Sequence, residues 1–396
     1  MTELYALEVN RLVDWGPQIR PTRAIVNLDA IAANAQQLSE RAGCALFAVV
    51  KADAYGHGAV PVSLALQEQF PEGNVLKGFA VSLVEEGIEL REAGVEMPIL
   101  VMGPSLMDAH SLLVEYGLMP MVSDVRHVEP LAHAARDSEQ VLQLHLKVDT
   151  GMGRLGIRPE SLGDALREVA LHPSLRLAGI ASHLACADTD DPSDPTSMSA
   201  AQLRLFGSLV ASCKSQVSSS VQFHVANSAA ILRFPDSQYD LARPGIALYG
   251  NGATAADGLT QAIRFSSEVS QVRGVPTGES VSYGAHWTAT RDSTVAIVPL
   301  GYADGLPRRL NLEGRAEVLI DGIRCPILGT VSMDMIVVDI TDTPTVRLGD
   351  EVVVLGEQGT ACISVSEVAE LCGITEYEVS CGISKRVPRR YERVHG

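Results

Sequence analysis

Leu46-Phe-Ala-Val-Val-Lys51-Ala-Asp-Ala-Tyr55-Gly-His-Gly58 sets the architecture expected for this chain. Five apolar residues in a row before Lys51 predict a strand covered on both faces, as in a parallel α/β sheet. Gly56 and Gly58 predict a turn into the next helix. Because a lysine at the end of a buried strand is poorly solvated, its charged form is disfavoured there. Lys51 is either a neutral amine able to form an imine with an aldehyde or a strand-end lysine that reaches solvent.

The same alternation of strand and helix continues along the chain. It predicts about eight strand–helix units, as a (β/α)8 TIM-like barrel of roughly 250 residues requires, although an open doubly wound sheet gives a similar pattern. A strand is also expected over Arg23–Leu28, so the predicted barrel spans residues 23–250. The other candidate strands are Leu46–Lys51, Gly78–Leu83, Pro98–Met102, Met119–Ser123, Val141–Asp149, Leu175–His183, Val221–Ala226 and Asp240–Leu248.

The composition changes after Gly250. Residues 251–258 form a turn-rich link of small residues, and the segments beyond it have the pattern of short strands joined by turns such as Asp321-Gly322. One helix is expected there, over Val365–Leu371. The sequence therefore predicts an α/β barrel followed by a mostly β C-terminal domain at residues 251–396, with residues 1–22 as a preamble of unassigned role.

The charge and the cysteines argue against several classes of function. A formal net charge of −17 argues against nucleic acid or an anionic membrane as a partner, since both are bound through basic patches. The seven cysteines are scattered and contain no C-x-x-C pair, so we expect neither a disulfide framework nor a metal site. The sequence has no apparent secretory signal and no apolar run long enough to span a bilayer, so the reducing cytoplasm is the expected location.

Candidate functional groups follow the predicted strands, whose carboxyl ends carry the active sites of barrel enzymes. Lys147 and Arg154 flank a glycine-rich turn, which either suits a phosphate or is simply solvated. His183 ends the next strand, where a single histidine is more often a core residue than a catalyst. The last two strands end in segments that suit an anion, a common arrangement for phosphate in barrels. These segments contain Asn227, Ser228, Arg243, Gly245 and Ile246.

Nine motifs, taken together and in the same order, resemble those of the alanine racemases. The resemblance covers the chain apart from the preamble. It implies a fold-type III enzyme that binds pyridoxal 5'-phosphate and acts as a homodimer with shared active sites. The motifs are KADAYGHG (51–58), KVDTGMGRLG (147–156), SH (182–183), HVANSA (224–229), ARPGIALYG (242–250), VSYGA (281–285), GYADG (301–305), SMDM (332–335) and RVPR (386–389).

The resemblance implies that Lys51 binds the cofactor covalently and acts as one of two catalytic bases. Tyr283, reaching the partner subunit's site, is implied as the other base; without the resemblance it would be interpreted as a core aromatic residue of the β-domain. Racemisation needs two bases because a proton must leave one face of the α-carbon and return to the other. A single lysine would mostly restore the original configuration.

Arg243 resembles the arginine that faces the pyridine nitrogen of the cofactor. A guanidinium donates a hydrogen bond without giving the ring a proton, whereas a carboxylate would hold a protonated ring and a stronger electron sink. By the same resemblance, barrel-type amino-acid decarboxylases have an acidic residue at the ring nitrogen, so Arg243 argues against that class of enzyme. A carrier of the cofactor without turnover would resemble the barrel alone, so the second domain and Tyr283 argue against that alternative.

The resemblance implies further roles. Arg154 lies near the cofactor's phenolic oxygen and the substrate carboxylate, and Met333 and Asp334 of the partner subunit lie beside the substrate. Lys147 is implied to be carbamylated, the alternative being an unmodified lysine with a bound anion. His183 is implied beside the cofactor and connected to Tyr283. The other implied cofactor contacts are Tyr55, Asn227, Ser228, Gly245, Ile246 and Tyr377, and the implied entrance residues are Asp188, Tyr302 and Arg308.

We therefore predict racemisation of a small amino acid, L- and D-alanine, which would supply D-alanine for peptidoglycan; a catabolic role stays open. One departure concerns the substrate, because the family usually has arginine at the position of Thr330, near the entrance. A shorter side chain would widen a corridor, so serine and other small amino acids are expected to be racemised better than in a typical relative. The alternatives are that neighbouring side chains refill the space, or that the inner wall around Tyr283 and Tyr377 alone sets specificity.

Overall fold

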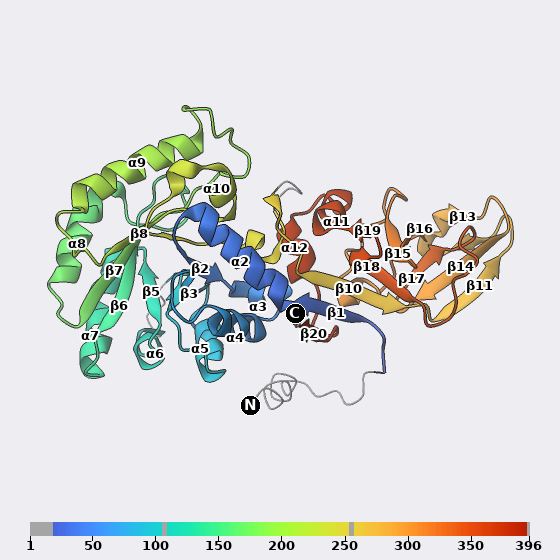
Figure 1. The fold of residues 1–396 in the computed structure, drawn as a ribbon, viewed down its shortest axis with the longest axis horizontal. Coiled ribbons are helices and arrows are strands. Elements are labelled where there is room, and N and C mark those ends of the chain that lie inside the picture. Colours follow the sequence, from blue (N-terminus) through green and yellow to red (C-terminus); the bar gives the residue numbers. More distant parts are fainter. Residues whose placement is uncertain (1–18, 105–108, 253–256, 394–396) are drawn as a thin grey trace. The chain divides into compact units, whose positions relative to one another are not determined.

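The computed structural model describes residues 19–104, 109–252 and 257–393 (Figure 1). The chain forms two compact units, each built from segments that are distant in sequence. The barrel unit comprises Ile31–Ala54 and Val62–Leu259, and the β unit comprises Met1–Ala30, Tyr55–Pro61 and Thr260–Gly396. Most of the predicted preamble, residues 1–18, lies outside the described residues.

Eight strands of the barrel unit pair in parallel, in the order β8-β7-β6-β5-β4-β3-β2-β9. Two backbone hydrogen bonds near β8 and β9, from Asp240 N to Phe223 O at 3.0 Å and from Arg243 N to Ala226 O at 2.9 Å, nearly close the barrel. The prediction of a barrel is confirmed. Its strands are β2 (Ala45–Val49), β3 (Leu76–Val81), β4 (Ile99–Val101), β5 (Met119–Val122), β6 (Leu142–Lys147), β7 (Leu175–Ala181), β8 (Gln222–His224) and β9 (Leu241–Ala242).

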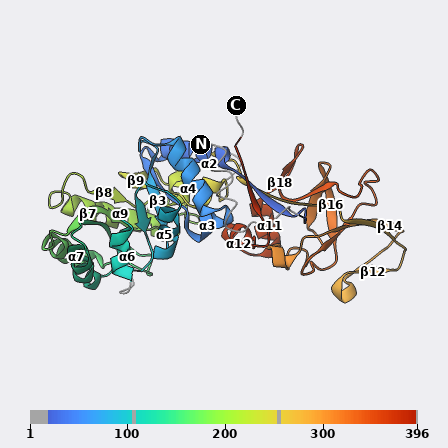
Figure 2. The same ribbon diagram turned by 90° about the horizontal axis from the view of Figure 1, so that it is seen from below.

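Helices surround the barrel strands (Figures 1 and 2). In α7, Val128, Leu131, Ala132 and Ala135 recur at helical spacing and are buried, and the helix packs against β6 and β7. Within the ranges that the structure describes, we find no helix with the length and apolarity to cross a membrane. The helices are α2 (Leu28–Ala42), α3 (Lys51–Gly56), α4 (Ala59–Gln69), α5 (Val84–Glu92), α6 (His110–Glu115), α7 (Val128–Asp137), α8 (Leu162–Ala170), α9 (Met198–Cys213) and α10 (Ser228–Arg233).

The β unit contains a ten-stranded sheet in the order β11-β14-β17-β16-β15-β18-β10-β1-β20, with β19 paired to β18. Its strands are β1 (Arg23–Asn27), β10 (Ile263–Glu268), β11 (Gln271–Val275), β14 (Ser293–Val298), β15 (Glu317–Ile320), β16 (Ile323–Leu328), β17 (Ile336–Asp339), β18 (Glu351–Gln358), β19 (Ala361–Ile363) and β20 (Arg389–Glu392). A separate two-stranded hairpin joins β12 (Ser280–Val281) to β13 (Trp287–Thr288). This unit confirms the prediction of a mostly β C-terminal domain.

The strand that was predicted to begin the barrel belongs to the other sheet. β1 pairs antiparallel with β10 and parallel with β20, so the first barrel strand is β2. The physical reason is visible in the burial of the side chains. Successive residues of β1 alternate between half-buried and buried, whereas four residues in a row are buried in β2. Alternation is typical of a strand with one solvated face, and continuous burial is typical of a barrel strand.

The described C-terminal part of the β unit has two α-helices, α11 (Val365–Cys372) and α12 (Glu376–Cys381), where the sequence predicted one. The predicted helix over Val365–Leu371 matches α11 to within one residue. α12 was missed because its six residues make fewer than two turns, too few for a helical period to be recognised.

Candidate active site

Lys51 lies just beyond the end of β2 and opens a turn with unusual backbone geometry. Residues 52–55 all have φ between 52° and 54°, although none of them is glycine. Left-handed backbone of this kind costs about 1–2 kcal/mol per residue. The Ala52 N–H donates a hydrogen bond to Glu86 Oε1 at 2.6 Å, which helps to hold the turn. Strained backbone persists where the surroundings fix it, and it is concentrated at functional sites.

Four cationic side chains of the barrel unit act electrostatically on His183. Burial, followed by the charges of Arg243, Lys147, Arg154 and Lys51, lowers the pKa of His183 to about 3. The imidazole is therefore neutral near physiological pH. Lys147 and Arg154 come from the same predicted strand end and the others from different ones, and the fold lets their charges act on one another. Such a concentration of positive charge suits an anionic ligand.

Lys147, at the end of β6, is buried among these cations. Burial, followed by the charges of Arg243 and Arg154, lowers the pKa of its ammonium group to about 8, against the opposing effect of Asp149. The neutral amine is therefore much more abundant near neutral pH than for a solvated lysine. The Asp149 carboxylate also accepts a hydrogen bond from the Gly151 N–H at 2.9 Å and so shapes the glycine-rich turn before Arg154.

Arg243 is buried in the barrel unit and has unusual partners for a buried cation. Its Nη2 donates to Ser182 O at 2.6 Å, and its Nη1 donates to Nδ1 of His224. Within the described part of the chain, none of its hydrogen bonds goes to a carboxylate. Burial lowers the pKa of the guanidinium to about 10, which still leaves it charged near neutral pH. The group can therefore donate hydrogen bonds to a ligand but cannot readily give up a proton.

Two buried histidines continue from Arg243. His224 Nε2 lies 2.8 Å from Nδ1 of His145. Burial, then Arg243, lowers the pKa of His145 to about 3, and burial lowers that of His224 well below its ordinary value, so both are neutral. Because Arg243 can only donate, His224 accepts at Nδ1 and donates from Nε2 to His145. Our sequence interpretation missed this pair, although His145 lies two residues before Lys147 in β6 and hence on the same face.

The ends of the last two barrel strands come together around Ser228, the first residue of α10. Its Oγ accepts hydrogen bonds from the backbone N–H groups of Gly245 at 2.8 Å and Ala247 at 3.2 Å. Asn227 caps the same helix through its side-chain oxygen. Because both amides donate to the Ser228 oxygen, its hydroxyl proton is left to donate, which suits an anion such as a phosphate.

Tyr283 lies in the β unit, on the turn between β12 and β13, and 74% of the residue is exposed. It is therefore not a core aromatic residue of this unit. Ser282 and Ala285 have φ of 64° and 49°, and each such position costs of order 1–3 kcal/mol. Thr330 Oγ1 donates to Tyr283 O at 3.1 Å, and Ser282 Oγ donates to Thr330 O at 2.6 Å. These bonds hold the turn through its backbone.

The GYADG and SMDM segments of the β unit form one structural element. The backbone N–H groups of Tyr302 and Ala303 donate to the carbonyls of Ser332 and Met333, both at 3.0 Å. Gly301 permits this approach, because a Cβ there would lie 2.4 Å from those two carbonyl oxygens. Tyr302 and Met333 remain partly exposed, at 38% and 51%. Backbone hydrogen bonds therefore hold these two segments together.

The RVPR motif joins this element through a buried carboxylate. Asp304 is fully buried and accepts hydrogen bonds from Arg20 Nη1 at 2.7 Å and from the Gly301 N–H at 2.9 Å. Arg386 Nε lies 3.6 Å from Asp304, and its Nη2 donates to Asp334 Oδ1 at 2.8 Å. The sequence interpretation assigned no role to Asp304 or Arg386. The only indication in the sequence was that Asp304 lies in the GYADG motif and Arg386 in the RVPR motif.

Further predicted residues of the β unit lie in two places. The rings of Tyr55 and Tyr377 are in contact, with their centroids 5.6 Å apart. Arg308 and Thr330 line one cavity of about 590 Å³, together with Trp287. Asp188, predicted beside Arg308, is an exposed residue of the barrel unit.

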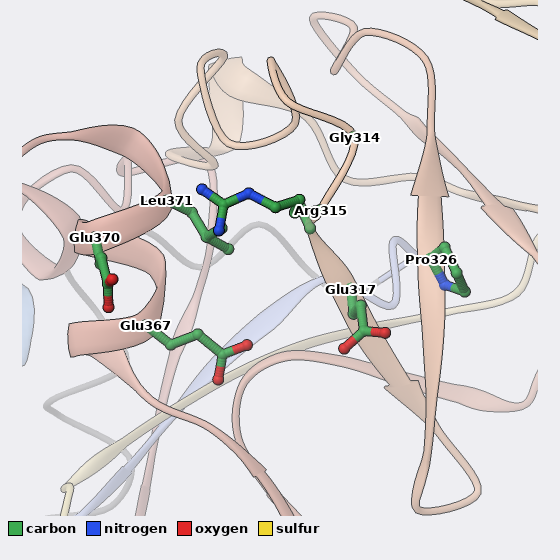
Figure 3. Close-up of a pocket in the computed structure, with 8 residues that line it drawn as sticks. Gly314, Arg315, Glu317, Pro326, Glu367, Glu370 and Leu371 are labelled. Atoms are coloured by element: carbon green, nitrogen blue, oxygen red, sulfur yellow. The ribbon is translucent and has the colours of Figure 1, made fainter.

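A second cavity of the β unit, of about 490 Å³, contains none of the predicted site residues (Figure 3). Glu317, Glu367 and Arg315 are among the residues that line it. Arg324 forms ion pairs with Glu317 at 3.1 Å and with Glu367 at 2.7 Å, so these carboxylates are already compensated. We assign this cavity no role in the candidate site.

The predicted site residues are divided between the two units. The barrel unit carries Lys51, Lys147, Arg154, His183, Asp188, Asn227, Ser228, Arg243, Gly245 and Ile246. The β unit carries Tyr55, Tyr283, Tyr302, Arg308, Met333, Asp334 and Tyr377.

Both units match families of known proteins. The family model "Alanine racemase, N-terminal domain" matches residues 26–252, and "Alanine racemase, C-terminal domain" matches residues 262–391. The chain belongs to the alanine racemase family. It is therefore an enzyme of the isomerase class, an amino-acid racemase.

Relatives and solved structures agree with this assignment over nearly the whole chain. The alanine racemase of Sorangium cellulosum is 43% identical over 387 residues, which cover 94% of this chain and 99% of the relative. The alanine racemase structure from Streptomyces lavendulae has a TM-score of 0.86 at 33% identity, covering 95% of this chain and 98% of that one. The biosynthetic alanine racemase of Pseudomonas aeruginosa has a TM-score of 0.82 at 37% identity, covering 94% and 100%.

Proposed function

We propose that this racemase interconverts L- and D-alanine with pyridoxal 5'-phosphate held by the barrel unit. The observation that carries the proposal is the concentration of positive charge from Lys51, Lys147, Arg154 and Arg243, which acts on a neutral His183. A strand-end amine beside an excess of positive charge suits a cofactor that has an aldehyde and a phosphate. The donor set around Ser228 supports the same conclusion.

The residues of the barrel unit fit the chemical groups of this cofactor. Lys51 offers an amine for the aldehyde, and Arg243 offers a hydrogen bond to the ring nitrogen. When bound, the cofactor supplies an electron-withdrawing ring that stabilises negative charge on the substrate's α-carbon. Arg243 donates without protonating the ring, which keeps that electron withdrawal moderate. Ser228, Gly245 and Ile246 are the proposed phosphate contacts of this unit, and Asn227 is a further proposed cofactor contact. Tyr55 and Tyr377, which belong to the β unit, are also proposed to contact the phosphate.

Lys51 and Tyr283 of the partner subunit are the two proposed bases. One base takes the α-proton from one face of the substrate, and the other delivers a proton to the opposite face, which inverts the centre. The roles exchange in the reverse direction. His183, kept neutral by its lowered pKa, is proposed to lie beside the cofactor and to connect with Tyr283.

Arg154 is proposed to bind the substrate carboxylate, and Lys147 is proposed to be carbamylated. The neutral Lys147 amine attacks carbon dioxide, an N–C bond forms, and the nitrogen loses a proton to give a carbamate with one negative charge. This replaces repulsion between two cations with a charge-assisted pair that orients Arg154. The lowered pKa of Lys147 favours the reactive amine and supports the proposal.

The active enzyme is proposed to be a homodimer with shared sites. Tyr283 and Met333 are 74% and 51% exposed on the β unit, so both are available to a second copy of the chain. Met333 and Asp334 of the partner subunit are proposed to contact the substrate, and Asp188, Tyr302 and Arg308 are proposed to form its entrance. Production of D-alanine for peptidoglycan in the cytoplasm is the corresponding physiological role.

Two other substrate or reaction classes remain to be compared. Racemisation of serine or other small amino acids is favoured by Thr330, which is short and lines the cavity beside Arg308. A barrel-type amino-acid decarboxylase is disfavoured, because the residue proposed to face the ring nitrogen is Arg243 and not a carboxylate.

The test is to incubate the purified protein and the cofactor with L-alanine and to follow circular dichroism and released carbon dioxide together. We expect the circular dichroism signal to decay to zero while no carbon dioxide appears. Racemisation gives an equal mixture of the two enantiomers and does not break the bond between the α-carbon and the carboxylate. Release of carbon dioxide with the loss of signal would indicate a decarboxylase. An unchanged signal with alanine but decay with serine would reassign the substrate.

A further inference from the structure

We propose that Thr330 is a positioning residue for Tyr283, acting through its hydroxyl group rather than through the size of its side chain. This inference rests on the proposed role of Tyr283 as a base. The direct observation is the hydrogen bond from Thr330 Oγ1 to the carbonyl oxygen of Tyr283, at 3.1 Å. Thr330 thereby contacts the backbone of the very residue whose phenol is proposed to move a proton.

The contact is reciprocal, which makes it a brace rather than a single bond. Ser282 Oγ donates to the carbonyl of Thr330 at 2.6 Å, so each segment donates one hydroxyl to the other's backbone. Gly329 lets the two segments approach, because a Cβ there would lie 2.8 Å from Ser282 Cβ. We call Ser282, Tyr283, Gly329 and Thr330 the tyrosine brace.

Among the described residues, Tyr283 is held through the backbone of its hairpin and not through packing of its side chain, so the brace bears directly on its position. The residue is 74% exposed, so side-chain packing does not fix its position. Its neighbours Ser282, Gly284 and Ala285 all have positive φ, a backbone that relaxes unless its surroundings hold it. A displacement of about 1 Å in a catalytic group can lower a rate about a hundredfold. The backbone bonds of the brace are therefore well placed to set the reach of the phenol.

The brace makes a different prediction from the widened corridor. If Thr330 acts by leaving space in the cavity beside Arg308, the size of its side chain matters and its hydroxyl does not. If it acts through the brace, the hydroxyl matters at constant size. Thr330→Val keeps the shape and removes the donor, whereas Thr330→Ser keeps the donor and removes a methyl group. These two variants form a matched pair that separates the alternatives.

The first measurement does not depend on catalysis. Amide hydrogen exchange of the peptide spanning residues 280–288 is compared in the native holoenzyme, Thr330→Val and Thr330→Ser, in the absence of substrate. Loss of one hydrogen bond is expected to speed exchange in Thr330→Val by about threefold to tenfold, with Thr330→Ser close to native. Equal exchange in all three proteins would overturn the brace.

The second measurement tests whether the brace serves Tyr283. Thr330→Val is expected to lower kcat for alanine by about threefold to tenfold with little change in KM, because the loss concerns the proton transfer and not substrate binding. In a Tyr283→Phe background the same substitution should cause no further loss, since the positioned group is gone. An equal further loss there would overturn the positioning role, as would a Thr330→Ser variant as slow as Thr330→Val.

Failure of the inference can be told apart from failure of the proposed function. If the native protein does not racemise alanine, the proposed function is wrong, while hydrogen exchange still reports whether the tyrosine brace exists. If the native protein racemises alanine and Thr330→Val matches it in rate and in exchange, only the brace is wrong.

Discussion

The two units of this racemase hold their proposed catalytic groups in opposite ways. In the barrel unit, Lys147, Arg243 and His224 are almost fully buried, and burial lowers the pKa of each. In the β unit, Tyr283 is largely exposed and is held by hydrogen bonds to the backbone of a strained turn. Strong electrostatics requires the exclusion of water, whereas a base offered to a second subunit must lie at the surface. Changes in the barrel unit should therefore alter chemistry, and changes in the β unit should alter positioning.

The largest effect is expected from Lys51→Ala, which removes the only proposed covalent attachment in the barrel unit. Racemisation should be abolished, and the cofactor should no longer be fixed to the protein by borohydride, because no amine remains to be reduced with it. Absorbance and mass spectrometry after borohydride treatment provide the measurement. Lys77→Ala, at an exposed lysine of β3, is the matched control and should behave as native. Retention of borohydride-fixable cofactor by Lys51→Ala would contradict the assignment.

The comparison between the units also predicts complementation. Lys51→Ala and Tyr283→Phe should each be nearly inactive alone, but mixing them should restore activity, because one site of each hybrid dimer has both bases. With free exchange of chains the recovery should reach about a quarter of native activity, since half the dimers are hybrids with one intact site of two. Activity is measured after mixing, with chain exchange verified by differently tagged subunits. No recovery despite exchange would mean that the sites are not shared.

A smaller effect, on stability, is expected in the buried histidine pair. His145→Leu leaves the His224 Nε2–H without its acceptor in a dry environment, which should cost about 1–3 kcal/mol. His145→Asn retains an acceptor and should lose less. The measurement is urea-induced unfolding. His133→Leu, at an exposed histidine of α7, is the control and should shift the midpoint little. An equal loss in His145→Asn and His145→Leu would mean that packing, not the hydrogen bond, is responsible.

The pH dependence of Lys147 tests how burial and neighbouring charges act on a lysine of the barrel unit. Only the neutral amine reacts with carbon dioxide, so carbamate formation should increase as pH rises through about 8. Because the folded pKa lies below the unfolded one, the unmodified lysine destabilises the fold below about pH 8, and this penalty declines as pH rises toward the unfolded value. Carbon-13 NMR with labelled bicarbonate measures the carbamate, and Lys147→Gln is the control. A high-resolution map with a bare amine beside a bound anion would refute carbamylation.

The smallest effect is expected for substrate choice at Thr330. Thr330→Arg should lower the ratio of the specificity constants for L-serine and L-alanine by a few fold, because one added group changes discrimination by only about 1–3 kcal/mol. Thr330→Arg also removes the hydroxyl that contacts Tyr283, so Thr330→Val is the necessary control. The explanation by a widened corridor holds only if Thr330→Arg changes the ratio of the two specificity constants and Thr330→Val does not. If the ratio is the same in all three proteins, Thr330 does not set substrate breadth.

Local sequence patterns predicted the elements of this fold because those patterns depend on neighbours along the chain. Continuous apolar runs identified the barrel strands, and the run before Lys51 fixed the position of that lysine at the end of β2. Motif order carried the family assignment, since the quoted segments recur in a fixed sequence. The same reasoning failed for β1, whose partners β10 and β20 lie far along the chain. The pattern of side chains along the strand could at most have indicated that one face is solvated. It could not have indicated which sheet the strand joins.

Contacts between distant residues were beyond the sequence for the same physical reason. His145 and His224 are separated by 79 positions, and neither segment carries a local signal that names the other as its hydrogen-bond partner. Tyr283 and Thr330 are separated by 47 positions, and the sequence suggested only that Thr330 is shorter than the usual arginine. The sequence alone indicated which side chains could take part in the reaction, namely Lys51, Arg243 and Tyr283. The direction of each hydrogen bond, the lowered pKa of Lys147 and the brace on Tyr283 arose only when folding removed water and brought those segments together.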